Sequence, residues 1–331
     1  MRNGLKLCVL ALAAMLLLPA QAEAAKVIKA GHGLTEFSAM HLGWVKFKEL
    51  VEERSKGAIQ VQIYPNQQLG GDRELTEGVQ LGNVTITCPT NAPLAAFEKD
   101  FFILDAPFMF ADHAEAHAAL DGEMGQALLK KLETINLVGL GYWENGFRNL
   151  SNSRNEVRKP DDVKGLKLRV MENAIHLAAW TALGANPAPM AFGELFTALQ
   201  QKTMDAQENP FGQIFDNKFY EVQPFITRSQ HLYSCFPVIM NKDFFDALST
   251  EEKEIIKSSV QDAKTYQREA ARKLDDEAAT KLVAAGRTII DLTAEERQAF
   301  VTKVASVSVA IKSRVSPEAF KLYEDHMSKK K

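Results

Sequence analysis

The spacing of apolar and polar residues near the middle of the chain predicts a strand that carries an arginine. Residues 166–170 alternate between aliphatic and basic side chains, which is the period of a strand with one face toward a core. Arg169 belongs to the polar set and lies near the end of this strand. We therefore expect its side chain to point away from the core that the aliphatic residues enter.

A helix and a second strand follow in the same unit. Asn173 is placed to cap a helix that ends at Gly184, and residues 203–208 have the pattern of a strand. Strand-helix-strand units favour parallel pairing, and ligands bind beyond the carboxyl ends of such strands. Arg169 and Asn209 both fall at those ends, so we expect a ligand site there.

Earlier in the chain the pattern predicts more units of the same kind. Strands are expected near residues 27–31, 59–63 and 84–88, with helices that begin near Ser38 and Asp72. Repeated strand-helix units indicate an α/β lobe whose central sheet is covered on both faces.

The second half of the pattern connects this lobe to another one. A strand over 135–140 runs on into the segment ENGFRNLSN, where we expect the chain to cross to a second lobe. Residues 226–240 read as one or two strands, interrupted at Pro237, that return to the first lobe. A capping box at Ser249 begins a charged helix over 249–285, which at roughly 1.5 Å per residue is long enough to lie along both lobes.

The amino terminus has a different composition from the rest. Arg2 and Lys6 precede an apolar run over 7–18, and residues 22–24 supply small side chains near a cleavage site. We interpret residues 1–25 as a secretory signal peptide and expect a soluble mature protein in the periplasm, because no later stretch approaches twenty apolar residues.

Charge and cysteine content exclude several classes of function. A net charge of -3 over 331 residues argues against nucleic-acid binding. Cys88 and Cys235 follow the leader at unrelated positions, which favours two buried thiols over a disulfide. The chain has no Gly-rich phosphate loop, no GxSxG motif and no paired-cysteine spacing, so we expect no cofactor and no catalysis.

One histidine pair has metal-ligand spacing. His113 and His117 lie four residues apart on a predicted helix and share a face. The sequence offers no acidic partner in a metalloprotease arrangement, so we interpret HAEAHAAL as a polar helix face and expect no metal site.

Several segments resemble the substrate-binding subunits of TRAP (tripartite ATP-independent periplasmic) transporters, the DctP-type extracytoplasmic solute receptors: LKLRV, ANPAPMAFGELFTALQ, DAQENP, IYPNQQLGGDRELTEGVQLGNVTIT, GYWENGFRNLSN and FYEVQPFITRSQH. The resemblance covers nearly the whole mature chain. It implies an α/β, two-lobe fold of the periplasmic-binding-protein type II kind, with the long helix spanning both lobes. Lobe 1 would comprise 26–145 plus 235–274, and lobe 2 would comprise 146–234 plus 275–331.

The resemblance assigns ligand roles to three residues. Arg169 matches the arginine that clamps a carboxylate, and a guanidinium suits this role because it binds a carboxylate through two parallel hydrogen bonds. The alternative for Arg169 is a surface salt bridge. Arg148 matches the second arginine segment, or alternatively braces the cleft by bonding a lobe-two backbone. Asn209 of QENP offers an amide to the ligand, or alternatively holds a turn.

Further candidates complete the predicted site. Phe192 would wall the pocket, as the resemblance supports, although an aromatic in such a loop is more often core. Loop positions at strand ends add weaker candidates: Trp143, Asn91, Thr90, Gly33, His32 and Phe211. The chain departs from the family's usual pattern at Lys202 and Ala206, where glycines are common.

The expected function is a receptor that traps an organic anion in the interlobe cleft. By resemblance it acts as a monomer and delivers the anion to the small and large integral membrane subunits of a TRAP transporter. QENP resembles the sugar-acid and sialic-acid receptors more than the four-carbon dicarboxylate receptors, which implies a sugar acid, a hydroxylated monocarboxylate, as the ligand; a dicarboxylate or a small sulfonate such as isethionate stays open. Two competing interpretations are a binding protein of an ATP-driven importer or sensor, and a periplasmic enzyme that acts on an acidic sugar.

Overall fold

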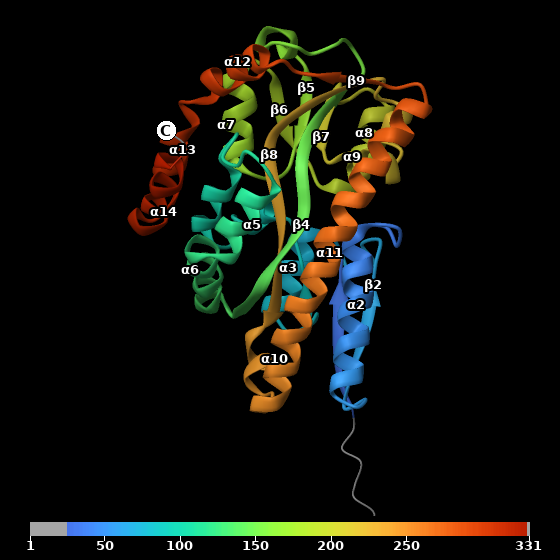
Figure 1. The fold of residues 1–331 in the computed structure, drawn as a ribbon, viewed down its shortest axis with the longest axis vertical. Helices are drawn as coiled ribbons and strands as arrows, with labels where there is room; N and C mark the ends of the chain where they lie inside the picture. Colours follow the sequence, from blue (N-terminus) through green and yellow to red (C-terminus); the bar gives the residue numbers. More distant parts are fainter. Residues whose placement is uncertain (1–24, 330–331) are drawn as a thin grey trace, which may run out of the picture.

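The computed structural model describes residues 25–329, so the predicted signal peptide, apart from Ala25, lies outside the described residues. The strands are β1 (Lys26–Gly31), β2 (Ile59–Tyr64), β3 (Ile86–Thr87), β4 (Leu137–Asn152), β5 (Lys167–Val170), β6 (Asn186–Pro189), β7 (Ala206–Asn209), β8 (Phe225–Asn241) and β9 (Thr288–Asp291). The α-helices are α2 (Ala39–Arg54), α3 (Asp72–Gln80), α4 (Asn91–Leu94), α5 (His113–Asp121), α6 (Glu123–Lys131), α7 (Ala174–Ala182), α8 (Leu195–Gln200), α9 (Phe211–Asp216), α10 (Lys242–Asp246), α11 (Thr250–Ala284), α12 (Ala294–Val304), α13 (Val307–Lys312) and α14 (Pro317–Ser328). Short 3-10 helices are η2 (Lys99–Asp105), η3 (Leu132–Ile135), η4 (Pro160–Val163), η5 (Phe192–Glu194) and η6 (Phe219–Glu221). The predicted α/β class is confirmed (Figure 1).

All the strands of the described residues belong to one sheet, in which two long strands join two groups of short ones. The order is β2-β1-β3-β8-β4-β7-β5-β6, and β9 pairs with β8. β4 and β8 are antiparallel neighbours along almost their whole length, from the pair Leu137 and Asn241 to the pair Asn152 and Phe225. β5 runs parallel to β7, so the predicted pairing within the strand-helix-strand unit is confirmed.

The predicted interruption at Pro237 is wrong, because β8 continues through it. Pro237 lies opposite Tyr142, directly beside a register shift between Gly139 and Gly141. A proline lacks the amide that a regular ladder needs, and a bulge is a place in a sheet where that loss is tolerated. A second register shift, between Glu144 and Gly146, falls where β4 passes from one group of strands to the other.

The predicted long helix is present as α11, which has 35 residues and would extend for roughly 50 Å. Ser249 caps it and Glu252 completes the expected capping box. Its first half packs in the core of β1, β2 and α2, whereas Ala278 and Leu282 near its other end pack with α8 and α9. One helix therefore buries apolar surface against both groups of strands (Figure 1).

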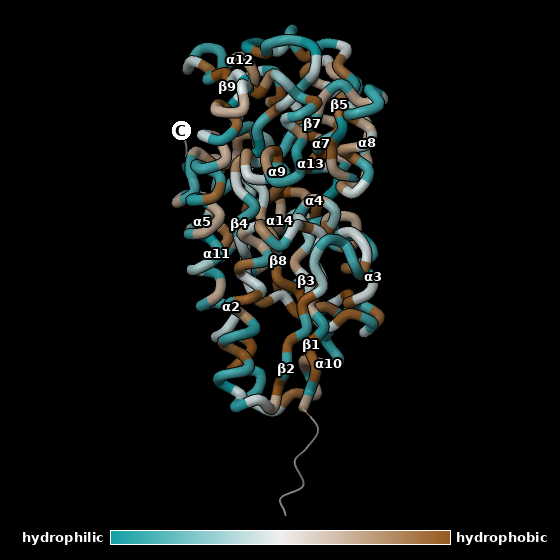
Figure 2. The backbone as a smooth tube through the Cα atoms, turned by 90° about the vertical axis from the view of Figure 1, so that its right-hand side faces the viewer, coloured by the Kyte–Doolittle hydropathy of each residue, from teal (hydrophilic) through white to brown (hydrophobic). Residues whose placement is uncertain are grey.

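Helix α2 approaches α11 closely at a glycine. A Cβ atom at Gly43 would lie 2.8 Å from Cγ of Gln267 and 2.9 Å from the Trp143 ring. The apolar residues of α2 face the sheet, and Figure 2 shows hydrophilic and hydrophobic residues alternating along its turns. This contact fixes the position of α11 relative to the first group of strands.

Two smaller expectations concern cysteines and the departures from the family pattern. Among the described residues, Cys88 and Cys235 are both buried and free.

Lys202 has a φ of 58°, the left-handed conformation that glycine adopts without a steric penalty, so a glycine would fit that turn without strain. Ala206 is fully buried in the main apolar core.

The carboxyl-terminal helices do not follow one group of strands. Contacts join α12 and α13 to α7, while α14 packs against η2 and α6. The sequence analysis placed α14 in lobe 2 and η2 and α6 in lobe 1. The last helix therefore bridges the two predicted lobes, whose boundaries remain a prediction.

Candidate functional site

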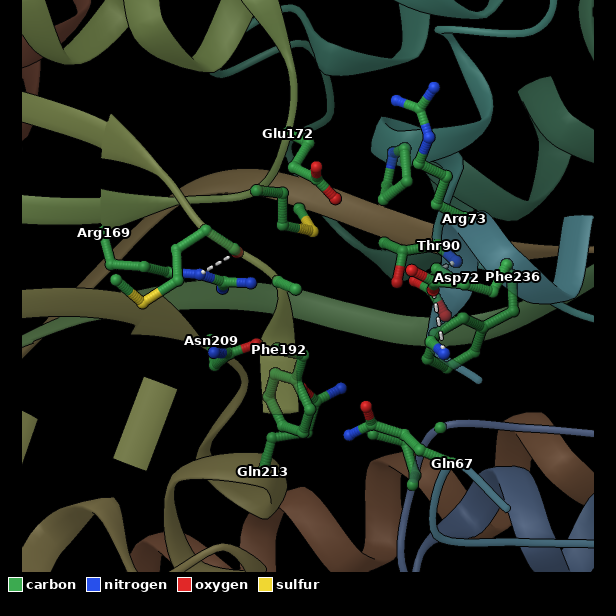
Figure 3. Close-up of a pocket in the computed structure, with 18 of the residues that line it drawn as sticks. Gln67, Asp72, Arg73, Thr90, Arg169, Glu172, Phe192, Asn209, Gln213 and Phe236 are labelled. Atoms are coloured by element: carbon green, nitrogen blue, oxygen red, sulfur yellow. Dashed lines mark hydrogen bonds between the residues drawn. The ribbon is translucent and has the colours of Figure 1, made fainter. Parts of the chain in front are cut away.

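A cavity lies where the carboxyl ends of β5 and β7 meet the loops that follow β1 and β3. Of the ten predicted site residues, six line it: Gly33, Thr90, Arg148, Arg169, Phe192 and Asn209. In Figure 3, Arg169 and Asn209 lie on one side of the cavity, and Asp72 and Thr90 lie on the other. The cavity thus brings together residues that are far apart in the sequence.

Arg169 is buried and has unused hydrogen-bonding capacity. Its exposed fraction is 2%, which excludes the alternative of a surface salt bridge. Nε donates to the carbonyl oxygen of Met190 at 2.9 Å, and Nη1 is buried with no hydrogen-bond partner among the described residues. Burial and the neighbouring Arg148 lower the pKa of Arg169 to about 10, so the guanidinium remains charged at neutral pH. A buried guanidinium with an unused donor suits an anionic ligand, whose charge-assisted hydrogen bonds would offset the cost of burying the cation.

Arg148 also lines the cavity, but most of its donors are taken. Nε lies 2.5 Å from Oε2 of Glu208, and Nη2 donates to Oε1 at 3.0 Å and also to the Glu208 backbone carbonyl. His231 Nε2 lies 3.2 Å from the same carboxylate. The bracing contact that the sequence analysis gave as the alternative for Arg148 is therefore present, and we call Arg148, Glu208 and His231 the buried charge cluster.

Asn209 is held at the end of β7 next to this cluster. Its backbone pairs with Asn149 of β4, and its Nδ2 donates to Oε1 of Gln207 at 2.6 Å. Pro210 follows and has an extended backbone, which turns the chain into α9. The side chain faces the cavity beside Arg169 (Figure 3).

A carboxylate stands across the cavity from Arg169. Asp72, at the first position of α3, accepts a hydrogen bond from the Thr90 amide at 3.0 Å. Burial raises the pKa of Asp72, and the Thr90 hydrogen bonds and the charge of Arg169 oppose that rise. The cavity therefore presents a cation at one end and an acidic acceptor at the other (Figure 3).

The opening of the cavity is narrow where its two sides meet. Phe192 packs against apolar residues of both the β1 core and the α8 and α9 core. A Cβ atom at Gly193 would lie only 2.7 Å from Oε1 of Gln67, so the loop after β2 touches the loop before α8. These contacts join the loops on the two sides of the cavity.

Four predicted site residues do not line the cavity. Trp143 packs on Trp44 with ring centroids 4.8 Å apart, and Phe211 lies in an apolar core under the guanidinium of Arg228. Asn91 donates to Asp105 at 2.9 Å and accepts from the Cys235 amide. His32 lies 3.1 Å from His41.

These four positions were chosen as loop residues at strand ends. Trp143 lies inside the long strand β4, so it is not at a strand end. Burial and the neighbouring His41 lower the pKa of His32 to about 3, so its ring is neutral and packed against the other imidazole. The side chains of these four residues pack or form hydrogen bonds within the protein. None of the four lines the cavity.

The sequence analysis missed several residues that line the cavity. Asp72, Gln67, Gln213 and Glu172 supply polar groups, and an apolar set comprises Leu34, Met40, Pro93, Met171, Met190 and Phe236. A signal for Asp72 was available, because an acidic residue after Gly70-Gly71 at a helix start sits where backbone amides gather. The methionines and Phe236 give no such signal.

Comparisons with known proteins decide the family. The model described as "Bacterial extracellular solute-binding protein, family 7" (DctP) matches residues 30–313. The chain belongs to this family. The 2,3-diketo-L-gulonate-binding periplasmic protein YiaO of Escherichia coli is 37% identical over 84% of this chain and 84% of its own length. The C4-dicarboxylate-binding periplasmic protein DctP of Rhodobacter capsulatus is 36% identical over 93% of this chain and 92% of its own.

A solved structure extends this DctP-family match to the fold. The sugar acid binding protein DctPAm of Advenella mimigardefordensis, in complex with galactonate, superposes with a TM-score of 0.89 at 39% identity, over 92% of this chain and 98% of that one. Members of the DctP family are extracellular solute-binding proteins rather than enzymes, so the predicted receptor function and the predicted lack of catalysis are confirmed. Within residues 25–329, none of the helices has the length and apolar content needed to span a bilayer.

Proposed function

We propose that this DctP-family receptor binds a hydroxylated monocarboxylate of the sugar-acid class. The proposal depends on the positions of Arg169 and Asp72, which face each other from opposite sides of one cavity (Figure 3). A guanidinium with a buried, unpartnered Nη1 suits the ligand carboxylate, which accepts hydrogen bonds. A carboxylate at the other end suits hydroxyl groups, which donate them.

The same pairing argues against a dicarboxylate. A second carboxylate that reaches the far side of the cavity would face the carboxyl group of Asp72, and the two groups would either repel as like charges or have to take up a proton, both of which weaken binding. The neighbours support the assignment in part. DctPAm was solved with galactonate and YiaO is named for 2,3-diketo-L-gulonate, whereas the Rhodobacter protein is named for C4-dicarboxylates.

We propose further that closure of two lobes traps this ligand. The lobes are 26–145 plus 235–274 and 146–234 plus 275–331, and the chain crosses between them at the register shift beside Gly146. Gly146 has a φ of 113°, a conformation that favours glycine, and hinge closure needs only a few such backbone positions. The contact of Gln67 with Gly193 and the double packing of Phe192 form on closure.

The proposed setting follows from the TRAP resemblance. After removal of residues 1–25 the receptor works in the periplasm and delivers its ligand to the small and large membrane subunits of a TRAP transporter. A micromolar dissociation constant corresponds to about -8 kcal/mol, and the contacts must also offset the cost of desolvating both ions. Arg169, the Asn209 amide and the exclusion of water on closure are the groups available for this.

A thermal-shift panel tests the ligand class. Galactonate, glucuronate, succinate and isethionate are added in turn to the mature chain, and calorimetry measures the affinity of each ligand that raises the melting temperature. A ligand at 100 times its dissociation constant stabilises by about 2.7 kcal/mol, which raises the melting temperature by several degrees. We expect a sugar acid to give the largest rise. If succinate binds more tightly than both sugar acids, the proposed ligand class is wrong and the site is one for dicarboxylates.

The substitution Asp72→Asn tests the selectivity argument. A hydrogen bond to a charged acceptor contributes about 1.5–3 kcal/mol, so sugar-acid affinity is expected to fall by about 10-fold to 100-fold. Succinate affinity is expected to rise, because the repelling charge is gone. The control is Glu172→Gln, which neutralises an exposed carboxylate of the same cavity and should change both affinities by less than about 3-fold. Equal effects of the two variants would contradict the role of Asp72.

A further inference from the structure

Three side chains with metal-ligand chemistry meet outside the ligand cavity. His113 and His117 project from α5, and Glu144 comes from β4. One potential ligand atom from each lies within 4.8 Å of the other two. We propose that His113, His117 and Glu144 form a binding site for a divalent transition-metal ion of the zinc type. We call this group the His-His-Glu cluster.

The distances in the cluster are close to those of a tetrahedral site. His113 Nδ1 lies 3.1 Å from Oε1 of Glu144, and His117 Nε2 lies 2.5 Å from Oε2. Zinc bonds of about 2.0–2.1 Å at tetrahedral angles place neighbouring ligand atoms roughly 3.3 Å apart. An ion can therefore enter once His117 Nε2 and Oε2 of Glu144 move apart by about 0.8 Å and the more widely separated ligand atoms, all within 4.8 Å of one another, draw closer together.

One atom of the cluster lacks a hydrogen bond. His113 Nδ1 is buried, and although it is near the Glu144 carboxylate it makes no well-aligned hydrogen bond with any described residue. A buried ring nitrogen whose nearest polar contact is poorly aligned recovers only part of its desolvation cost, and coordination to a metal ion would offset the rest. Two histidines and a carboxylate, with a fourth position left for water, are a donor set that zinc accepts.

Glu144 is held in place by hydrogen bonds to its backbone and to its carboxylate. The backbone amide and carbonyl of Glu144 both bond to Gln267 of α11 at 2.7 Å, and the Tyr233 hydroxyl donates to Oε2 at 3.3 Å. These contacts hold an anionic ligand in place before an ion binds.

The cluster is open to solvent on its histidine side. The side chains of His113 and His117 are 36% and 17% exposed, whereas that of Glu144 is 1% exposed. Arg272 and Asp275 of α11 carry charges of opposite sign near His113, so their electrostatic effects on its imidazole partly cancel. An ion would join α5 to β4 at the register shift between Glu144 and Gly146. The proposed ligand-binding function does not depend on this metal site.

Metal titration of the mature chain, prepared without a histidine tag, tests the proposal. Competition with a chromogenic chelator at neutral pH measures Zn²⁺ affinity, and Co²⁺ absorption reports coordination geometry, since four-coordinate cobalt has intense visible bands. We expect one ion per chain in a four-coordinate site. We expect His117→Gln to weaken Zn²⁺ binding by about 100-fold or more, because loss of an outer contact alone costs 10-fold to 100-fold. His113→Gln, at a more exposed position, serves as the second variant if His117→Gln fails to fold.

The control is His41→Gln, which removes an imidazole from the His32 and His41 pair, outside the His-His-Glu cluster. It should leave Zn²⁺ affinity unchanged. The absence of Zn²⁺ binding by the folded wild-type chain would overturn the proposal. So would unchanged affinity in both folded cluster variants, or loss of binding in His41→Gln, which would place the ion at the other pair.

Discussion

Replacing Arg169 by methionine should weaken ligand binding by at least about 30-fold while leaving the unliganded protein at least as stable as the wild type. Arg169 is 2% exposed, and its Nη1 is buried without a partner among the described residues. Truncating one partner of a buried, hydrogen-bonded charge pair costs about 2–5 kcal/mol, which is a loss of affinity of about 30-fold to several thousand-fold. Burial lowers the pKa of Arg169 to about 10, so its charge is less favourable in the folded protein than in the unfolded chain. An apolar side chain of similar length removes that cost.

Calorimetry with the acid found in the ligand panel measures the loss of affinity, and chemical denaturation without ligand measures the free energy of unfolding. The matched control is Arg73→Met, which removes an exposed arginine of the same cavity that pairs with Glu77 at 3.3 Å. Its affinity should stay within about 3-fold of the wild type. If Arg169→Met keeps the wild-type affinity, Arg169 does not bind the ligand carboxylate. If both variants lose the same affinity, the total charge of the cavity determines binding.

The sequence predicted the orientation of Arg169 but not its surroundings. Alternation over 166–170 places Arg169 opposite the core-facing aliphatic residues, and such a position is usually exposed. The structure covers this face with the segment around Met190 and Phe192, whose place depends on parallel pairing of β6 with β5. Period-two patterning carries no information about such long-range covering, so the predicted ligand role depended on the strand-end position of Arg169 and on the family resemblance.

Partners from distant strands could not be predicted. Glu208 lies between Gln207 and Asn209 in the QENP segment, and nothing local indicates that it meets Arg148. The meeting depends on the register of β4 with β7, in which Leu150 pairs with Glu208. The same holds for Glu144, which reaches the histidines of α5 only because β4 passes beside that helix. Regular elements were better predicted, since caps and periodicity are local signals.

The substitution Glu208→Gln should destabilise the protein by about 3–5 kcal/mol, the cost of breaking a buried ion pair by removing one partner. The side chains of Arg148 and Glu208 are 1% and 0% exposed, so water cannot replace the lost carboxylate. Native stabilities are about 5–15 kcal/mol, so this is a large part of the total. Denaturant unfolding at neutral pH measures it. In the double variant Arg148→Met/Glu208→Gln no charge is left unpaired, so its loss should be smaller than that of Glu208→Gln alone.

The pH dependence of the unfolding free energy shows whether Glu208→Gln destabilises the protein through the lost charge or through altered packing. Burial would raise the pKa of Glu208, but the charge and hydrogen bonds of Arg148 and His231 hold it well below its usual range. A depressed folded-state pKa gives stabilisation that is fully present above the unfolded value of about 4.3 and is lost as the pH falls below it. The difference in unfolding free energy between wild type and Glu208→Gln should therefore narrow between pH 5 and pH 3. A difference that stays constant over this range would mean that the glutamine side chain fails by shape rather than by charge, and the buried charge cluster would then contribute packing alone.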